Sequence, residues 1–293
     1  MNFWEWYDLQ LLATAQNDIP KHELEWLICR VTCLDKLDLR LRSPNITAKI
    51  TPEIFANLDQ LWHKRLSDRL PVQYLTGSVT WRNLKLQVSP AVLIPRPETE
   101  LIVDIIASSC QEQIYQQGLW LDLGTGSGAI AIAIAQQFPD AQVHAIDVSI
   151  DALAIAQINA SQNQKSYPQS NLHFHHGSWF TPVAQLGLQQ KVIGLVSNPP
   201  YIPSDEIIKL QPEVKNHEPH LALDGGTDGL NALRELVAIA PDYLMSSGFW
   251  IVEMMAGQAN LVQSLLENDG RYTNIKIHPD YASIDRFISA YRK

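Results

Sequence analysis

Four consecutive residues, Asn198-Pro199-Pro200-Tyr201, combine the groups needed to hold a planar nitrogen. The lone pair of an amide or an exocyclic amine is delocalised, so such a nitrogen is a poor nucleophile. The Asn198 side-chain oxygen and the Pro199 carbonyl are two acceptors that can fix its N–H groups and turn its lone pair toward an electrophile. Pro199 and Pro200 stiffen the turn, and Tyr201 offers an aromatic face to a planar group or a cation. By itself the same motif would also suit a rigid structural turn.

A glycine-rich loop, Gly124-Thr125-Gly126-Ser127-Gly128, follows a short apolar run and precedes an Ala/Ile-rich helical segment. Its glycines let backbone N–H groups approach a ligand closely. Asp147 ends the next apolar run, where a carboxylate can accept hydrogen bonds from both hydroxyls of a ribose. The chain has no Walker lysine after the loop, and Ala129 stands where the third glycine of a dinucleotide pattern would fall. Together with the planar-nitrogen turn, these residues predict methyl transfer from S-adenosylmethionine, with S-adenosylhomocysteine as the product.

The elements that must position these residues alternate between strands and helices after residue 119. Apolar runs that predict strands lie at 119–123, 142–146, 173–174, 192–197 and 248–253, and helices are expected up to Gln137 and over 150–163. This alternation predicts an α/β fold with a parallel, doubly wound sheet. In such a sheet, ligands bind beyond the carboxyl ends of the strands at the topological switch point. Both the glycine-rich loop and the Asn198 turn fall at such ends.

The part of the chain before this sheet has a different pattern. Residues 1–70 show helical spacing, with Thr51 as an N-cap followed by Pro52. Residues 72–89 then alternate apolar and polar residues around Arg82-Asn83, which predicts a β-hairpin. We therefore expect a helical domain over 1–71, a β-hairpin linker over 72–90 and the α/β domain over 91–293.

Motifs along nearly the whole chain resemble the HemK/PrmC family of protein-(glutamine-N5) methyltransferases. The most specific is Leu93-Ile-Pro-Arg-Pro-Glu-Thr-Glu100, between the hairpin and the α/β domain. The resemblance also includes 71–77, 122–128, 198–202 and 217–230. It implies a class I S-adenosylmethionine-dependent methyltransferase with a Rossmann-like fold. The implied target is the glutamine of the Gly-Gly-Gln motif in peptide chain release factors.

The resemblance also implies roles for individual residues. Gly124 to Gly128, Asp147 and Asn198 would hold S-adenosylmethionine, and Trp179 would lie beside the adenine. Asn198 to Tyr201 would hold the glutamine amide, and the N-terminal helices would dock the body of the release factor. Arg96 and Glu98 would lie close to the cleft, either in binding or in a salt bridge that fixes their loop.

Three positions depart from the family's pattern. Ser178 stands where an aspartate is usual, so a hydroxyl would replace a carboxylate as the expected partner of the adenine amine, a weaker acceptor. Met255 and Ser283 stand where glycines are usual, which predicts local shifts of the backbone. Because the Asn198 turn is intact, these departures bear on cofactor affinity more than on activity.

Charge and composition limit the remaining possibilities. The net charge of −9 is carried almost entirely after residue 90, which argues against a broad phosphate-binding surface. We therefore expect no direct contact with nucleic acid. The sequence shows neither a signal peptide nor an apolar run long enough for a membrane span, so we expect a cytoplasmic monomer. Its three cysteines predict no disulfide framework, and His173, His175 and His176 alternate between faces of a strand, so we expect no metal.

Two other functions remain open on the sequence. An N6-adenine methyltransferase acting on DNA or RNA could use the same Asn-Pro-Pro-Tyr turn, because an exocyclic amine poses the same chemical problem. A non-catalytic module that binds S-adenosylmethionine is the other. The acidic α/β half weighs against the first alternative, and the presence of both Asp147 and Asn198 weighs against the second.

Overall fold

The computed structural model describes residues 2–43, 46–164 and 171–293. Within this part, the chain divides into two compact units. The helical unit comprises Met1–Gly77 and Pro212–His217, and the α/β unit comprises Ser78–Gln211 and Glu218–Lys293. The short segment within the helical unit is thus inserted between two stretches of the α/β unit.

The helical unit forms because amphipathic helices bury large aromatic and aliphatic side chains together. Its helices are α1 (Phe3–Gln16), α2 (Lys21–Val31), α3 (Lys36–Leu41), α4 (Ile46–Lys49), α5 (Pro52–Ser67), α6 (Val72–Thr76) and α12 (Pro212–His217). As predicted, Thr51 caps α5 by accepting a hydrogen bond from the Ile54 N–H. The buried Arg65 pairs with Glu23 and with Glu213 of α12 at 2.7 and 2.8 Å, so α12 is an integral part of this unit.

The predicted hairpin is confirmed, although it is shorter than the change in pattern suggested. Residues 72–76 form α6, and only β1 (Ser78–Trp81) and β2 (Leu84–Gln87) pair antiparallel. Arg82 in the turn adopts a φ of 50°. The hairpin belongs to the α/β unit, where Trp81, Leu84 and Leu86 are buried in the core of one sheet face.

The rest of the α/β unit alternates strands and helices as the apolar runs predicted. Its helices are α7 (Glu100–Ser109), α8 (Gln113–Gln117), α9 (Ala129–Gln137), α10 (Ile150–Gln162), α11 (Thr181–Gln185), α13 (Asn231–Tyr243) and α14 (Ala259–Asp269), with single 3-10 turns at Ile207–Lys209 and His220–Ala222. Its strands are β3 (Leu119–Leu123), β4 (Gln142–Asp147), β5 (Leu172–His176), β6 (Val192–Ser197), β7 (Leu244–Glu253), β8 (Tyr272–Pro279) and β9 (Asp285–Arg292).

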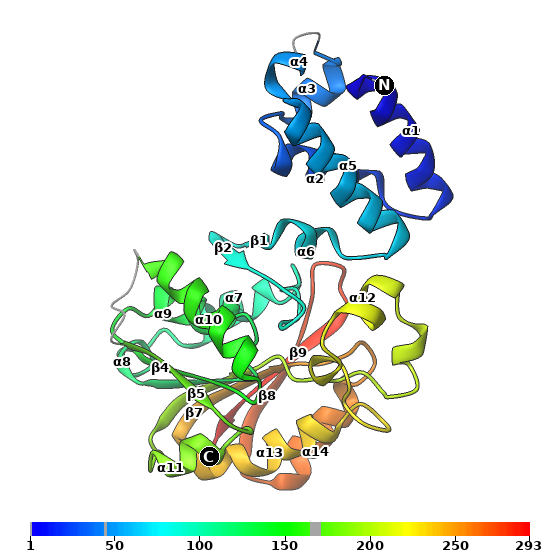
Figure 1. The fold of residues 1–293 in the computed structure, drawn as a ribbon. Helices are drawn as coiled ribbons and strands as arrows, with labels where there is room; N and C mark the ends of the chain where they lie inside the picture. The colour runs from blue at the N-terminus through cyan, green and yellow to red at the C-terminus, as the bar shows by residue number, and fades with distance from the viewer. Residues whose placement is uncertain (1, 44–45, 165–170) are drawn as a thin grey trace. The chain divides into compact units, whose positions relative to one another are not determined.

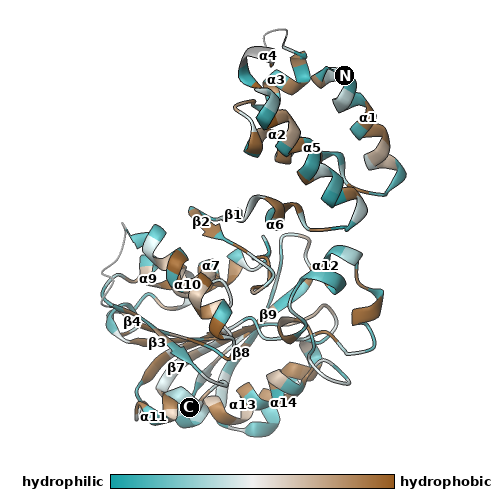
Figure 2. Cartoon of the chain, viewed as in Figure 1, coloured by the Kyte–Doolittle hydropathy of each residue, from teal (hydrophilic) through white to brown (hydrophobic). Residues whose placement is uncertain are grey.

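These strands form a doubly wound sheet, seven-stranded within the described residues, in the order β5-β4-β3-β6-β7-β9-β8. The first five in this order run parallel, whereas β9 pairs antiparallel with β7 and with β8. Helices α7, α9 and α10 cover one face, and α11, α13 and α14 cover the other (Figure 1). Hydrophobic stretches lie along the strands between these layers (Figure 2). The predicted α/β class is therefore confirmed.

The sequence patterns missed the last two strands of this sheet. Strands β8 and β9 form an antiparallel pair at its end, after the parallel strands that the alternation indicated. Exposed polar residues of β8, Asn274 and Lys276, alternate with half-buried ones, a weak signal beside the apolar runs of the central strands. More important for the site, β3 and β6 are neighbours, with β4 and β7 on their outer sides. The topological switch point therefore lies between β3 and β6.

Candidate active site

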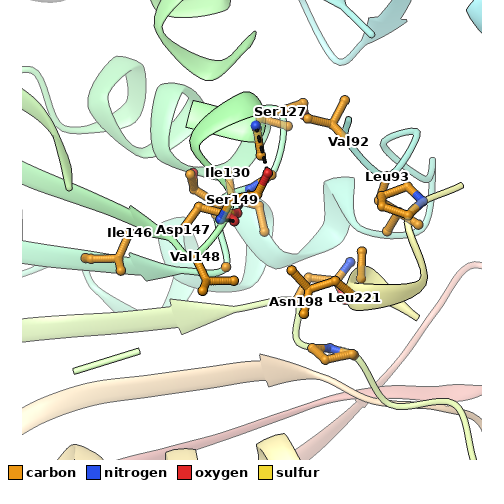
Figure 3. Close-up of a pocket in the computed structure, with 18 of the residues that line it drawn as sticks. Val92, Leu93, Ser127, Ile130, Ile146, Asp147, Val148, Ser149, Asn198 and Leu221 are labelled. Atoms are coloured by element: carbon orange, nitrogen blue, oxygen red, sulfur yellow. Dashed lines mark hydrogen bonds between the residues drawn. The ribbon is translucent and has the colours of Figure 1, made fainter. Parts of the chain in front are cut away.

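A cavity of about 300 Å³ lies at the carboxyl ends of β3, β4 and β6, beside the switch point. This volume is at the lower end of the range for small-molecule sites. Most of the residues that the sequence singled out line it: Gly124, Thr125, Gly126, Ser127, Asp147, Trp179, Asn198 and Pro200. Asp147 and Ser149 lie on one side and Asn198 and Leu221 on the opposite side (Figure 3). The structure thus brings the two predicted halves of the site to a common cavity.

Gly128, Pro199 and Tyr201 are not among the lining residues. Gly128 is the N-cap residue before α9 and has a φ of 82°, and Ala156 lies close to where its Cβ would be. Pro199 is buried within the turn. Tyr201 packs against the core and donates its hydroxyl proton to Glu253 at 2.9 Å.

The glycine-rich loop is anchored from below by Asp122 at the end of β3. This carboxylate is fully buried and accepts hydrogen bonds from the Thr125 hydroxyl at 2.6 Å and the Ala131 N–H at 3.0 Å. Burial raises the pKa of Asp122 to about 7, and the two hydrogen bonds oppose this rise. Gly124 and Gly126 have φ of 75° and 55°, in the left-handed region that favours glycine.

Asp147 ends β4 and is tied to the loop by its own hydrogen bonds. One carboxylate oxygen accepts from the Gly126 N–H at 2.8 Å, and the other accepts from the Ser149 N–H at 2.9 Å. Burial raises the pKa of Asp147, while these N–H donors stabilise the ionised form. Each carboxylate oxygen has further lone pairs, so this side chain can still accept from ligand hydroxyls.

These residues fit an adenosyl ligand. Gly124, Gly126 and the Asp147 carboxylate at the end of the neighbouring strand line the cavity. The Trp179 ring forms an aromatic wall, and it would lie 3.5 Å from a Cβ atom built on Gly124. Ser178, the departure from the family's aspartate, also lines the cavity. Any hydrogen bond to the adenine amine from position 178 would therefore come from a hydroxyl.

The Asn198 turn follows β6 directly and is held by side chains from other strands and loops. The Asn198 Nδ2 donates to the Thr99 hydroxyl at 3.3 Å, and the Thr99 hydroxyl donates to Glu253 at 2.6 Å. At the other end of the turn, the Gln258 Nε2 donates to the Tyr201 carbonyl at 3.0 Å. Burial raises the pKa of Glu253, and the hydrogen bonds from Thr99 and Tyr201 oppose this rise.

The segment before α7 forms another wall of the cavity. Arg96 lines it and pairs with the buried Glu218 at 2.7 Å, while the other Glu218 oxygen accepts from the Ile94 N–H at 3.3 Å. The Trp81 indole of the hairpin donates to the Arg96 carbonyl at 2.9 Å. Arg96 therefore fixes its own loop, whereas Glu98 is exposed and does not line the cavity.

Two groups of residues with clear roles in the site escaped the sequence reasoning. Asn159 of α10 joins the hairpin to the glycine-rich loop, because its Nδ2 donates to the carbonyls of Gln87 and Ser127. Thr99 and Glu253 support the turn. Glu253 had an available signal, since it is a carboxylate at the end of a predicted strand, where functional residues of such sheets gather. A single asparagine within a helical pattern, such as Asn159, gives no comparable signal.

In the part of the chain that the structure describes, no cluster of three His, Cys, Asp or Glu side chains has a geometry suited to a metal ion. The rings of His144 and His175 stack, with 2.9 Å between the His144 Nδ1 and the His175 Nε2. These residues belong to β4 and β5 and do not line the cavity. Nor does any described helix combine the length and apolar character needed to cross a bilayer.

Comparison with known proteins agrees with this geometry. Residues 98–211 match the family model described as "Methyltransferase small domain", and residues 9–77 match the "PrmC N-terminal domain". The α/β fold is also that of a solved methyltransferase from Pyrococcus furiosus, which is 16% identical with a TM-score of 0.50 over 82% of this chain and 98% of that one. This likeness confirms the predicted class I methyltransferase fold.

Full-length relatives identify the family. A Synechocystis protein named release factor glutamine methyltransferase is 46% identical over 98% of this chain and 95% of its own length. Proteins of the same name from Thermosynechococcus vestitus and Gloeobacter violaceus are each 42% identical over 98% of this chain and 96% of their own lengths. These relatives do not favour the nucleobase alternative. The chain is an S-adenosylmethionine-dependent methyltransferase and belongs to the release factor glutamine methyltransferase family.

Proposed function

We propose that this enzyme methylates the side-chain amide nitrogen, N5, of the glutamine in the Gly-Gly-Gln motif of peptide chain release factors. The observation that carries the proposal is the position of the Asn198-Pro199-Pro200-Tyr201 turn. It follows β6 at the switch point and presents Asn198 and Pro200 to the cavity that Asp147 enters from the opposite side. The names of the full-length relatives support the same substrate.

The methyl donor would be held by Gly124 to Gly128, Asp147 and Trp179, with Asn198 at the boundary between donor and substrate. S-adenosylmethionine supplies an electrophilic methyl group and leaves as S-adenosylhomocysteine. The Asp147 carboxylate suits ribose hydroxyls, because both of its oxygens are already oriented by backbone N–H groups. The cavity wall is largely apolar, which limits competing water near the reacting nitrogen.

The contribution of the turn to catalysis is positioning. The Asn198 Oδ1 and the Pro199 carbonyl would accept the two N–H groups of the glutamine amide and so fix its plane. With the N–H groups held, the nitrogen lone pair is directed at the methyl carbon, and a proton can leave after the new bond has formed. No strong base is needed, and Pro200 keeps the two acceptors in a fixed relation. Tyr201 acts through its anchoring hydroxyl.

A protein substrate requires a surface beyond the cavity. We assign docking of the release factor body to the helical domain, residues 1–71; of the stretch 72–90 that the sequence indicated as a linker, the hairpin packs within the methyltransferase domain. The match to the PrmC N-terminal domain supports a role shared with the family. We further propose that the enzyme acts as a monomer in the cytoplasm, where translation ends, without contacting nucleic acid directly.

The test is transfer of labelled methyl groups from S-adenosylmethionine to purified release factor. We expect labelling of a factor that carries Gly-Gly-Gln and no labelling of a Gly-Gly-Ala variant of the same factor. Because the variant retains the whole docking surface, this pair isolates the target side chain. Equal labelling of both factors would refute the proposed target.

Duplex DNA and ribosomal RNA form the second arm of the same experiment. The adenine alternative predicts labelled nucleic acid and an unlabelled release factor. The net charge of −9, concentrated in the half that contains the site, favours the protein substrate.

A further inference from the structure

Glu253 connects both ends of the catalytic turn to a neighbouring strand. It is the last residue of β7, which pairs with β6 through Ser197 and Val252, and its side chain is 3% exposed. One carboxylate oxygen lies 2.6 Å from the Thr99 hydroxyl and the other lies 2.9 Å from the Tyr201 hydroxyl. Both hydroxyls therefore share a single buried acid.

In the ionised state of Glu253, the direction of every hydrogen bond in this group is fixed. An ionised carboxylate can only accept, so Tyr201 and Thr99 must both donate their hydroxyl protons to Glu253. Burial raises the pKa of Glu253, and the hydrogen bonds from Thr99 and Tyr201 and the positive charge of Arg286 oppose this rise and stabilise the ionised form. Thr99 then has only lone pairs to offer to Asn198, which lies 3.3 Å away. Asn198 must meet it with its NH2 group, because the asparagine oxygen could not donate.

The orientation of the Asn198 amide follows from this chain. With its Nδ2 directed to Thr99, the amide turns its Oδ1 to the other side, where a substrate N–H needs an acceptor. The reversed amide would direct its NH2 group at the substrate N–H, so two donors would face each other. Its Oδ1 would then face the lone pairs of Thr99, and both hydrogen bonds would be lost. An asparagine amide has two nearly isosteric orientations, so its partners decide which one is populated.

The Thr99 hydroxyl bonds to Glu253 and Asn198 and does not cap its own helix. It is the N-cap residue of α7, where a threonine hydroxyl usually accepts from the first turn of its own helix. Here the hydroxyl makes no capping hydrogen bond and bonds Glu253 and Asn198 instead. The Ile-Pro-Arg-Pro-Glu-Thr-Glu run thus delivers a hydroxyl to the catalytic turn.

We propose that Glu253, acting through Thr99, is a positioning residue that sets the Asn198 amide in its productive orientation and anchors Tyr201 at the other end of the turn. This inference rests on the proposed role of Asn198 in holding the substrate amide. Neither Glu253 nor Tyr201 lines the cavity, so Glu253 acts on catalysis only through its partners.

Four variants of the full-length enzyme test this proposal. Glu253→Gln keeps the shape of the side chain but adds a donor, which allows Thr99 to donate to Asn198 and reverse its amide. Thr99→Val removes the relay, whereas Thr99→Ser retains the hydroxyl. Glu235→Gln, at an exposed position on α13, is the matched control for loss of one carboxylate.

We expect Glu253→Gln and Thr99→Val to lower kcat for release factor methylation by about 10- to 100-fold, somewhat less than direct loss of a preorganised group. Thr99→Ser should remain within about threefold of the wild type. S-adenosylhomocysteine affinity should change little in Glu253→Gln, because Glu253 does not line the cavity. A merely structural acid predicts lower thermal stability with kcat unchanged. Wild-type kcat in Thr99→Val, or equal losses in Thr99→Ser and Thr99→Val, would overturn the proposal.

A measurement without substrate separates this proposal from the proposed function. In protein labelled with 15N-asparagine, the Asn198 side-chain NH2 signal is identified by its loss in Asn198→Ala. We expect it to shift in Glu253→Gln and Thr99→Val and to stay in place in Glu235→Gln. An unshifted signal in the first two variants would refute the relay even if the enzyme methylates release factors. Conversely, the shift can be observed even if the substrate assignment fails.

Discussion

Replacing Asp147 with asparagine should separate cofactor binding from folding. The two carboxylate oxygens accept from the N–H groups of Gly126 and Ser149 at 2.8 and 2.9 Å and leave lone pairs for the ribose. Asparagine has a single acceptor oxygen, so its NH2 group must face one of these N–H donors or a ribose hydroxyl. Because burial raises the pKa of Asp147, the substitution also removes a desolvation cost, and we expect little loss of thermal stability.

The magnitude follows from the hydrogen bonds at stake. Loss of one hydrogen bond to a charged group costs about 1.5 to 3 kcal/mol, which corresponds to about 10- to 150-fold weaker binding. Isothermal titration calorimetry with S-adenosylhomocysteine measures this change directly. Asp151→Asn is the matched control, since Asp151 is exposed in the first turn of α10 and does not line the cavity. A Kd for Asp147→Asn within twofold of the wild type, or an equal change in Asp151→Asn, would refute the assigned role.

Four further substitutions test separate parts of the structure. Asn198→Ala should retain S-adenosylhomocysteine binding but lose about 10²-fold or more in turnover, as for a lost positioning contact, and unchanged turnover would contradict its acceptor role. Asp122 has a pKa of about 7 when folded, against about 3.9 unfolded, so its contribution to stability is lost as pH rises through this interval. Asp122→Asn should therefore gain about 2 to 3 kcal/mol on the wild type between pH 5 and pH 8 in denaturant unfolding, and a pH-independent difference would exclude the raised pKa. Ser283 has a φ of 61°, so Ser283→Gly should stabilise by about 0.5 to 1 kcal/mol in thermal melts, whereas Met255→Gly, at a position without a positive φ, should not.

Much of the fold was predictable because its signals are local. The apolar runs of the central strands, the Thr51 cap and the glycines between β3 and α9 each depend on a few neighbouring residues. Strand β8 carries a weaker pattern, since it lies at the edge of the sheet and exposes alternate residues, whereas β9 is buried between β7 and β8. Their pairing depends on contacts between segments that no short pattern specifies.

In the site, too, residues with a local sequence signal were predictable, whereas contacts between distant segments were not. Asp147 and Asn198 were predictable because each follows an apolar strand, and parallel strands bring such ends together. The link from Asn198 through Thr99 to Glu253 joins residues far apart in the sequence, and it depends on the adjacency of β6 and β7. The anchoring of the Tyr201 hydroxyl by Glu253, a buried acid from another strand, was likewise beyond any local pattern.

The most direct test of the account is the chemical position of the transferred methyl group. After reaction with the release factor, the labelled Gly-Gly-Gln peptide can be isolated and hydrolysed, and the volatile product identified. If the Asn198 turn presents the glutamine amide nitrogen to the methyl donor, hydrolysis must release the label as methylamine. Release of the label as methanol under mild base would place it on a carboxylate oxygen and would contradict the claim that this site methylates a planar nitrogen.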